Sequence, residues 1–140
     1  MKDSSVPQKN SWEISLGDFL EDAVAANPNA TFLEIMGSTY SYENFYEHVL
    51  KAASFYRSLG VTNGDRVCLV LPNCPEVLFS WFGLSVIGAI AVPINTAYKK
   101  EELTYIFNDS GADVLVAHLN FLNEAGAAAR MTPSIKQNIC

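Results

Sequence analysis

The side chains in this sequence that could do chemistry are three cysteines, two histidines and a few neighbouring carboxylates. Cys68, Cys74 and Cys140 are odd in number and form no C-x-x-C pair. Their spacing to the histidines matches no zinc site. We interpret Cys68, which lies within an apolar run, as a small buried hydrophobic residue. A disulfide framework is not expected, which favours a reducing compartment.

The histidines and carboxylates lack partners at catalytic or metal-ligand spacing. His48 and His118 stand far apart, and His48 falls between polar neighbours on a predicted helix, so we expect it to be solvated. The carboxylates that could pair as general acid and base also fall on predicted helices: Glu43 with Glu47, and Glu101 with Glu102. On an amphipathic helix such pairs are typical of the solvated face.

The loops contain no nucleotide-binding or nucleophile motif. The first core strand is followed by Leu71-Pro72-Asn73-Cys74-Pro75, where a dinucleotide-binding domain would have G-x-G-x-x-G. Two prolines remove backbone N–H donors from this segment. A Walker phosphate loop and a G-x-S-x-G elbow are also missing from the sequence. We therefore assign no catalytic, cofactor-binding or metal-binding residue in this chain.

The composition is that of a folded, acidic domain. The 140 residues are 49% hydrophobic, which argues against intrinsic disorder, and their number suits one domain. Lys and Arg number 9 against 15 Asp and Glu, a formal net charge of −6. This balance argues against a nucleic-acid partner and against a polybasic membrane-surface role, since both need clustered cations.

One uncharged segment must be examined as a candidate membrane span. Residues 77–94 contain no charged side chain, over a length at the threshold for a spanning helix. Glycine and serine dilute the run and Pro93 interrupts its end, so we expect a helix and then a strand within one core. Residues 1–15 lack the apolar centre of a signal peptide, and we expect a flexible leader there and a cytoplasmic location.

Hydrophobic periodicity and turn residues predict the elements that must position any site. The predicted helices cover residues 16–26, 42–59, 75–87, 99–108 and 121–130, a small hairpin covers 31–40, and strands cover 66–71, 90–93 and 113–117. Residues 133–140 begin a further element that the chain does not finish. The alternation of strand and helix from residue 66 to 117 predicts an α/β fold with parallel strands and right-handed crossovers.

Individual residues define the expected helix faces and ends. Ser41 is the expected N-cap of the long helix, and Gly60 is expected just beyond its end. The apolar stripe of that helix is formed by Phe45, Val49, Ala52, Tyr56 and Leu59. The face shared in the first helix is formed by Phe19, Ala23 and Ala26. Asn95 or Thr96 is expected to cap the helix over 99–108.

The sequence contains several short motifs whose order points to one family. They are YSYENF at 40–45, GDRV at 64–67, LPNCPE at 71–76, the run from 81 to 95 with GAIAVPIN at 88–95, and EELTYIFNDSGA at 101–112. In order and spacing they resemble the N-terminal part of the adenylate-forming enzymes, most closely the AMP-forming acyl-CoA synthetases. Residue by residue, these motifs are most similar to those of carnitine/crotonobetaine-type and medium-chain ligases. Val86-Ile87-Gly88 departs from the Lys-Ala-Gly-like turn that is common in the family.

The resemblance implies both a fold and a reaction. The fold is an incomplete N-terminal subdomain of an AMP-binding domain over residues 16–140, with a βαβαβ core preceded by a small hairpin and a long helix. In the full-length parent, ATP and a carboxylate give an acyl-adenylate and pyrophosphate, and CoA then displaces AMP. ATP, Mg and CoA are implied for that parent only, because the family's phosphate loop would follow Cys140.

Three hypotheses about function follow. The first is an N-terminal fragment of an acyl-CoA synthetase, inactive alone, whose partner is the remainder of the parent enzyme. Because the apolar run over residues 77–94 would lack part of its parent core, a homodimer is a further expectation. The second is a truncated, non-catalytic product that acts as an interaction module. The third is the start of another adenylate former, such as a luciferase-like or peptide-synthetase adenylation domain.

Overall fold

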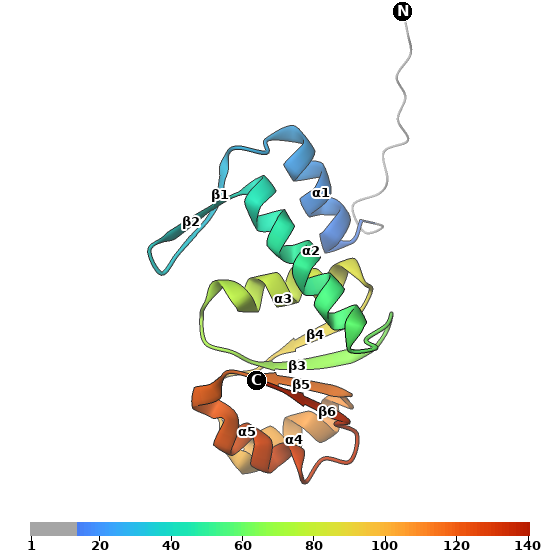
Figure 1. Ribbon diagram of the computed structural model, residues 1–140. Helices are drawn as coiled ribbons and strands as arrows, with labels where there is room; N and C mark the ends of the chain where they lie inside the picture. Colours follow the sequence, from blue (N-terminus) through green and yellow to red (C-terminus); the bar gives the residue numbers. More distant parts are fainter. Residues whose placement is uncertain (1–13) are drawn as a thin grey trace, which may run out of the picture.

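The chain folds into two stacked parts that share one long helix. The computed structural model describes residues 14–140. A four-stranded parallel sheet is covered by helices on both faces, and a helix and a hairpin lie beyond the helices of one face (Figure 1). The α/β subdomain that the sequence predicts is therefore confirmed. Residues 1–13, most of the expected flexible leader, lie outside the described residues.

The sheet has the strand order β4-β3-β5-β6. Its strands are β3 (Arg66–Val70), β4 (Ile90–Pro93), β5 (Val114–Ala117) and β6 (Gln137–Ile139). β3 pairs in parallel with both β4 and β5, and β5 pairs in parallel with β6. The first three strands confirm the predicted alternation. The fourth strand is formed by the segment that we expected to begin an unfinished element.

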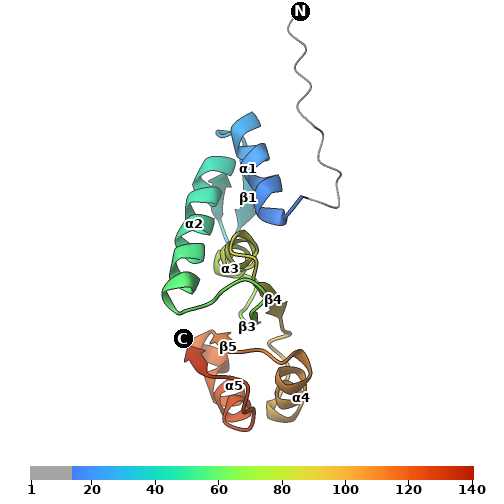
Figure 2. The same ribbon diagram turned by 90° about the vertical axis from the view of Figure 1, so that its right-hand side faces the viewer.

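Helices cover both faces of this sheet, as Figure 2 shows from the side. They are α2 (Tyr42–Ser58) and α3 (Pro75–Val86) on one face, and α4 (Lys100–Ser110) and α5 (Leu122–Ala129) on the other. Val67 and Leu69 of β3 pack in the cluster with α2 and α3, while Cys68 and Val70 pack in the cluster with α4 and α5. An unbroken apolar run thus buries both faces of the central strand, as expected for a parallel sheet.

A third cluster lies above α3. It is formed by α1 (Leu16–Ala26), the antiparallel hairpin of β1 (Thr31–Ile35) and β2 (Ser38–Ser41), and the first half of α2. Met36 and Gly37 at the hairpin tip have φ values of 52° and 78°. Such left-handed pairs form the tight turns that suit the twist of a hairpin. Leu20, Phe45 and Phe79 are buried where these pieces meet.

The face of α1 that Phe19, Ala23 and Ala26 share is not the packed one. Phe19 is 61% exposed, whereas Leu20 is 1% exposed and Gly17 is buried. The helix is oriented by its contact with α3, where a Cβ on Gly17 would lie 3.0 Å from Cγ2 of Val86. The small residue therefore marks the packed side. Ser15, which we placed in the leader, is the N-cap, and its side chain accepts a hydrogen bond from the Asp18 N–H.

The ends of the later helices confirm one prediction and correct another. Gly60, with a φ of 83°, follows the end of α2 as predicted. The predicted cap of α4 is wrong, because Asn95 accepts a hydrogen bond from the Ala97 N–H and closes a turn before the helix. Glu102 instead accepts from the Lys99 N–H at 2.9 Å. Glu124 of α5 accepts from the Lys100 N–H at 2.9 Å.

The uncharged run at residues 77–94 is divided between α3 and β4, as predicted. None of the helices within residues 14–140 has the length and apolar character needed to cross a membrane. β4 is only partly buried, because this strand is an edge and Ile90 is 45% exposed. The Ile90 N–H donates to the Asp65 carbonyl, just before β3, and the Ile94 N–H donates to Leu69 of β3. By alternation, the backbone nitrogens of Ala91 and Pro93 face away from β3. Proline has no N–H, which blunts this edge.

Helices α2 and α3 approach each other closely at Gly83, in the middle of α3. A Cβ there would lie 2.9 Å from the Ala52 Cβ, 2.9 Å from the Ala53 nitrogen and 3.1 Å from the Val49 carbonyl oxygen. The backbone of α2 rests directly on this position. The predicted apolar stripe of α2 is wrong at one position. Ala53 is buried, whereas Ala52, which we placed in the stripe, is only half-buried against α3.

We predict that Gly83→Ala lowers the free energy of unfolding by roughly 1–3 kcal/mol, because two backbone groups must move to admit the methyl group. Gly126→Ala in α5 is the matched control, since nothing outside the helix's own backbone lies within 3.8 Å of its Cβ. That change should raise stability by roughly 0.5–1 kcal/mol through helix propensity alone. Urea denaturation followed by circular dichroism measures both. Equal effects at the two glycines would contradict the close approach.

Candidate functional site

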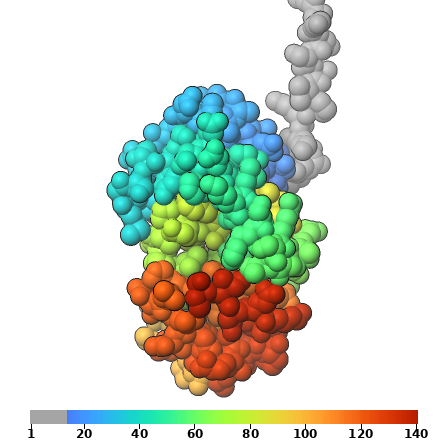
Figure 3. All heavy atoms as spheres, viewed as in Figure 1, coloured from blue at the N-terminus to red at the C-terminus, as the bar shows by residue number. Residues whose placement is uncertain are grey.

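A groove lies at the carboxyl ends of the sheet strands, with a volume of ≈ 580 Å³. Figure 3 shows this side of the molecule, where residues after β3 and after β5 face each other. The carboxyl edge of a parallel sheet is where open α/β domains bind their ligands. Its walls come from five separate segments: Met36, the α2 residues Ala52, Phe55 and Tyr56, residues 71–80, residues 116–119, and Ile139 with Cys140.

The groove is mostly apolar, with a few polar groups. Ser80 and Tyr56 lie at its floor, and burial raises the pKa of Tyr56, an effect that a hydrogen bond with Ser80 partly offsets. Glu76 supplies a negative charge. The described residues that line the groove include neither Lys nor Arg. Their chemistry therefore suits an uncharged, apolar occupant and opposes a phosphate group.

The loop after β3 lies along this groove and has no spare run of N–H donors. Pro72 and Pro75 have no N–H, and the Cys74 N–H donates to the Pro72 carbonyl at 2.8 Å. Cys74 is the N-cap of α3, with Pro75 at the first helical position. This geometry agrees with the sequence argument that the segment cannot cradle a phosphate with consecutive backbone amides.

The three thiols have three different environments, and all are free. Cys68 is fully buried, which raises its pKa to about 11, and Ser110 at 3.7 Å is its nearest polar partner. Cys74 is half-buried. Its burial, and to a smaller extent the nearby Glu76, raises the pKa of its thiol. Cys140 is exposed at the end of β6. The expectation that Cys68 behaves as a core residue is confirmed.

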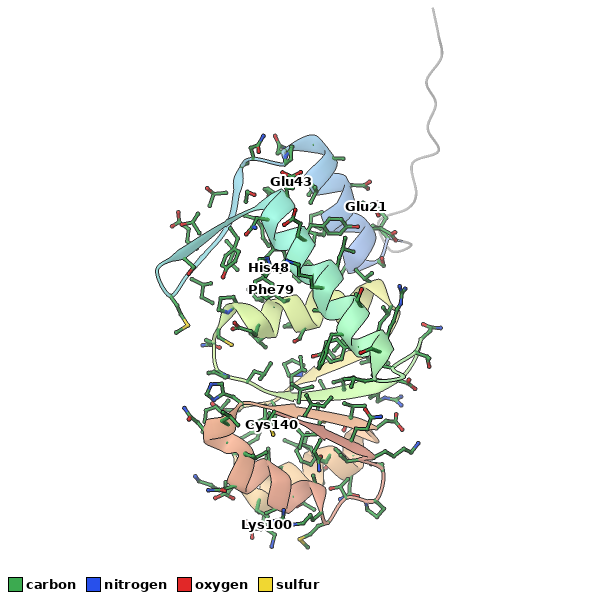
Figure 4. The ribbon with its side chains drawn as sticks, viewed as in Figure 1. Glu21, Glu43, His48, Phe79, Lys100 and Cys140 are labelled. Atoms are coloured by element: carbon green, nitrogen blue, oxygen red, sulfur yellow. The ribbon has the colours of Figure 1, made fainter. Side chains whose placement is uncertain are left out.

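His48 is half-buried, and so less solvated than we expected. Its ring stacks on Phe79 with a centroid distance of 4.7 Å and an interplanar angle of 23°, and Tyr40 meets its edge at 5.7 Å (Figure 4). The Nδ1 atom lies 2.9 Å from the Asn44 carbonyl oxygen, so Nδ1–H is the donor. The hairpin and α3, both distant in sequence, bring these rings together. His48 is therefore a packing residue of the third cluster.

The other candidate side chains are scattered. His118 stands at the rim of the groove, where its Nδ1 accepts a hydrogen bond from the Asn120 N–H at 3.2 Å. The carboxylates Glu43, Glu47, Glu101 and Glu102 are exposed, as predicted, although Glu102 also caps α4. Figure 4 places Lys100 of α4 at the far end of the molecule from His48. Within residues 14–140, groups of three or more potential metal ligands do not occur.

Sequence reasoning missed the groove because its walls share no motif. Met36, Phe55 and Leu119 come from a hairpin tip, a helix and a short 3-10 turn, and each is a lone exposed hydrophobic residue in the sequence. One indication was available, since Leu71 ends one predicted strand and His118 directly follows another. The carboxyl ends of parallel strands meet at the same edge of a sheet.

Comparison with known proteins gives a consistent result. The family model described as "AMP-binding enzyme" matches residues 20–139. A crotonobetaine/carnitine–CoA ligase of Escherichia coli O1:K1 is 45% identical over 82 residues, which are 59% of this chain and 16% of that protein. The N-terminal domain of FACL13 from Mycobacterium tuberculosis superposes with a TM-score of 0.82 at 25% identity, covering 89% of this chain and 33% of that chain.

A second solved structure is also similar. The anthranilate CoA ligase AuaEII, in complex with anthranoyl-AMP, superposes with a TM-score of 0.82 at 29% identity. The superposition covers 89% of this chain and 24% of that chain. The chain thus spans only a minor part of the length of each of these relatives.

We predict that the three thiols react in the order Cys140, Cys74, Cys68 with a disulfide reagent at pH 8. Cys140 is exposed, Cys74 is half-buried with a raised pKa, and Cys68 is fully buried with a pKa of about 11. Only the thiolate attacks, so a raised pKa slows the reaction. Mass spectrometry after timed quenching assigns the sites. Modification of Cys68 before unfolding in guanidinium would contradict the packing of β3.

Proposed function

Because the chain belongs to the family of AMP-binding enzymes, we propose that it is the N-terminal part of an ATP-dependent acid–thiol ligase. That ligase would activate a carboxylate as an acyl-adenylate and transfer the acyl group to CoA. The observation that supports this most is the match over residues 20–139, together with the similarity to crotonobetaine/carnitine–CoA and anthranilate CoA ligases. A crotonobetaine- or carnitine-like acid is the substrate that the 45% identity favours.

The described residues do not fit the cofactors that the family uses. ATP and its Mg²⁺ need clustered cations, backbone amides or carboxylates around the phosphates. The groove residues described here include no cation, the β3–α3 loop has two prolines, and the described side chains form no metal cluster. We therefore derive no step of the reaction through ATP, Mg²⁺ or CoA on this chain, and we propose that it is inactive alone.

The role that we propose for this chain is structural. We propose that residues 16–140 form an incomplete subdomain that supports the rest of a ligase domain, with Ser15 belonging to its first helix as the N-cap. Sheet and helices bury both faces of β3, so this part has a core of its own. The cytoplasmic location stays a prediction, to be read from the distribution of a tagged chain.

A second candidate function is favoured by one observation. The chain exposes an apolar groove of ≈ 580 Å³, and exposed apolar surface marks sites that contact other polypeptides. A non-catalytic interaction module would use that groove without any ligase reaction. The two candidates differ in one result, which is whether adding the missing part of a ligase creates activity.

We predict that the purified chain catalyses no ATP–pyrophosphate exchange with any carboxylate. Co-expression with the part of AuaEII that follows the superposed segment should give exchange with anthranilate above that of the AuaEII part alone. The physical reason is that the phosphate-binding groups would come from AuaEII and the supporting sheet from this chain. The control is the same AuaEII part with an empty vector. Exchange by the chain alone, or no gain on co-expression, would refute the proposed function.

A further inference from the structure

We propose that Asn63 is a site of spontaneous deamidation, and that a contact between the turn at residues 62–65 and Gly88 must open before it reacts. Asn63 is followed by Gly64, and the sequence contains no other Asn-Gly pair. The Asn63 side chain is exposed to solvent. This inference concerns a modification of the chain itself, so it holds whether or not the chain is part of a ligase.

The reaction needs only the chain and water. The backbone nitrogen of Gly64 attacks Cγ of the Asn63 carboxamide, so that a new N–Cγ bond forms and the Cγ–Nδ2 bond breaks. Ammonia leaves with the proton of the Gly64 N–H, and a cyclic succinimide remains. Water then opens one of the two imide carbonyls and gives aspartate or isoaspartate at position 63. Glycine favours the attack because no Cβ obstructs the approach of its nitrogen.

In the folded chain the attacking nitrogen is already engaged. The Gly64 N–H donates to the Gly88 carbonyl at 2.9 Å, and Gly64 has a φ of 87°. The turn around it is closed by a hydrogen bond from the Asp65 N–H to the Thr62 carbonyl at 3.2 Å. Because the Gly64 N–H is directed at Gly88, this hydrogen bond must break before the nitrogen can attack.

The carboxamide that would be attacked is held at the same place. A Cβ added to Gly88 would lie 3.0 Å from Cγ of Asn63 and 3.3 Å from its Cβ, so the Asn63 side chain packs against the Gly88 backbone. Gly88 lies between α3 and β4. Both reacting groups are therefore in contact with one residue of a distant segment, and they can meet only when this contact opens.

The contact with Gly88 is the outermost link of a hydrogen-bonded ladder. Next to it, the Ile90 N–H donates to the Asp65 carbonyl at 2.8 Å, and the parallel pairing of β3 with β4 follows. The Asp65 carboxylate accepts from the N–H and the hydroxyl of Thr62 at 2.7 and 3.0 Å, which lowers the pKa of Asp65. Because the outermost link is exposed, it can open while the sheet stays folded.

Deamidation would loosen the start of this ladder. Aspartate at position 63 places a second carboxylate in the same turn as Asp65, and the two like charges repel each other. Isoaspartate adds a methylene group to the main chain, which displaces the Asp65 N–H from the Thr62 carbonyl. The modification therefore weakens the link between β3 and the segment that joins α3 to β4.

The test compares the folded 140-residue chain with a synthetic peptide of residues 58–66, both kept at pH 8 and one temperature. Trypsin releases the same peptide from the chain, because it follows Arg57 and ends at Arg66, and it contains no other Asn or Gln. Mass spectrometry follows the conversion of the amide to a carboxylate. We expect Asn63 to be modified in both, at least about tenfold more slowly in the folded chain. Equal rates would overturn the proposal.

Hydrogen exchange of the Gly64 amide measures the opening independently. Exchange and deamidation both need the hydrogen bond to Gly88 to break, so their protection relative to the free peptide should agree within about tenfold. A larger disagreement would show that another event controls the reaction and would contradict the proposal. This comparison uses the unaltered chain and does not depend on the folding of any variant.

Two glycine variants locate the contact. Gly88→Ala places a methyl group against the Asn63 side chain and should accelerate deamidation at least about fivefold, because the contact opens more often. Gly111→Ala is the matched control, since Gly111 also has a positive φ, of 63°, and nothing lies within 4 Å of its added Cβ. The control should leave the rate unchanged, and circular dichroism checks both folds. Equal acceleration by the two variants would refute the role of Gly88.

Discussion

The contact between α2 and α3 at Gly83 holds the two parts of this molecule together. The α2 backbone rests on a position where any Cβ would lie within 3.1 Å of two backbone atoms. That approach puts the first half of α2 in the cluster with α1 and the hairpin, and its second half in the cluster over the sheet. One helix therefore belongs to two cores. The small residue at the crossing point is what allows both to be packed at native density.

This arrangement explains which parts of the sheet are covered and which are exposed. β3 is covered on both faces, and its thiol at Cys68 is sealed between the sheet and α4. The carboxyl edge has no such cover, and apolar side chains from the hairpin, α2 and the turn after β5 surround a hollow there. Chemistry at that edge is limited by what lines it. An apolar, cation-free wall can bind polypeptide, whereas the adenylation reaction of the family needs charged groups around phosphate.

The sequence predicted the elements well because their determinants are local. Gly60 ends α2, Pro75 begins α3, and the apolar run at residues 66–71 forms a strand buried on both faces. The failures depend on distant partners. Phe19 faces solvent because Gly17 packs on α3, and His48 is half-buried against rings from the hairpin and α3. Periodicity within one helix does not report which side a distant segment will cover.

The central claim is that this chain is a folded support that binds no nucleotide by itself. The most direct measurement is a titration of the ¹⁵N-labelled 140-residue chain with Mg-ATP, followed by ¹H–¹⁵N correlation spectra. The account predicts a dispersed spectrum from a folded core, with no amide that shifts in a saturable way, at the groove or in the β3–α3 loop. Saturable shifts that cluster on one surface would show a nucleotide site in this chain and would contradict the account.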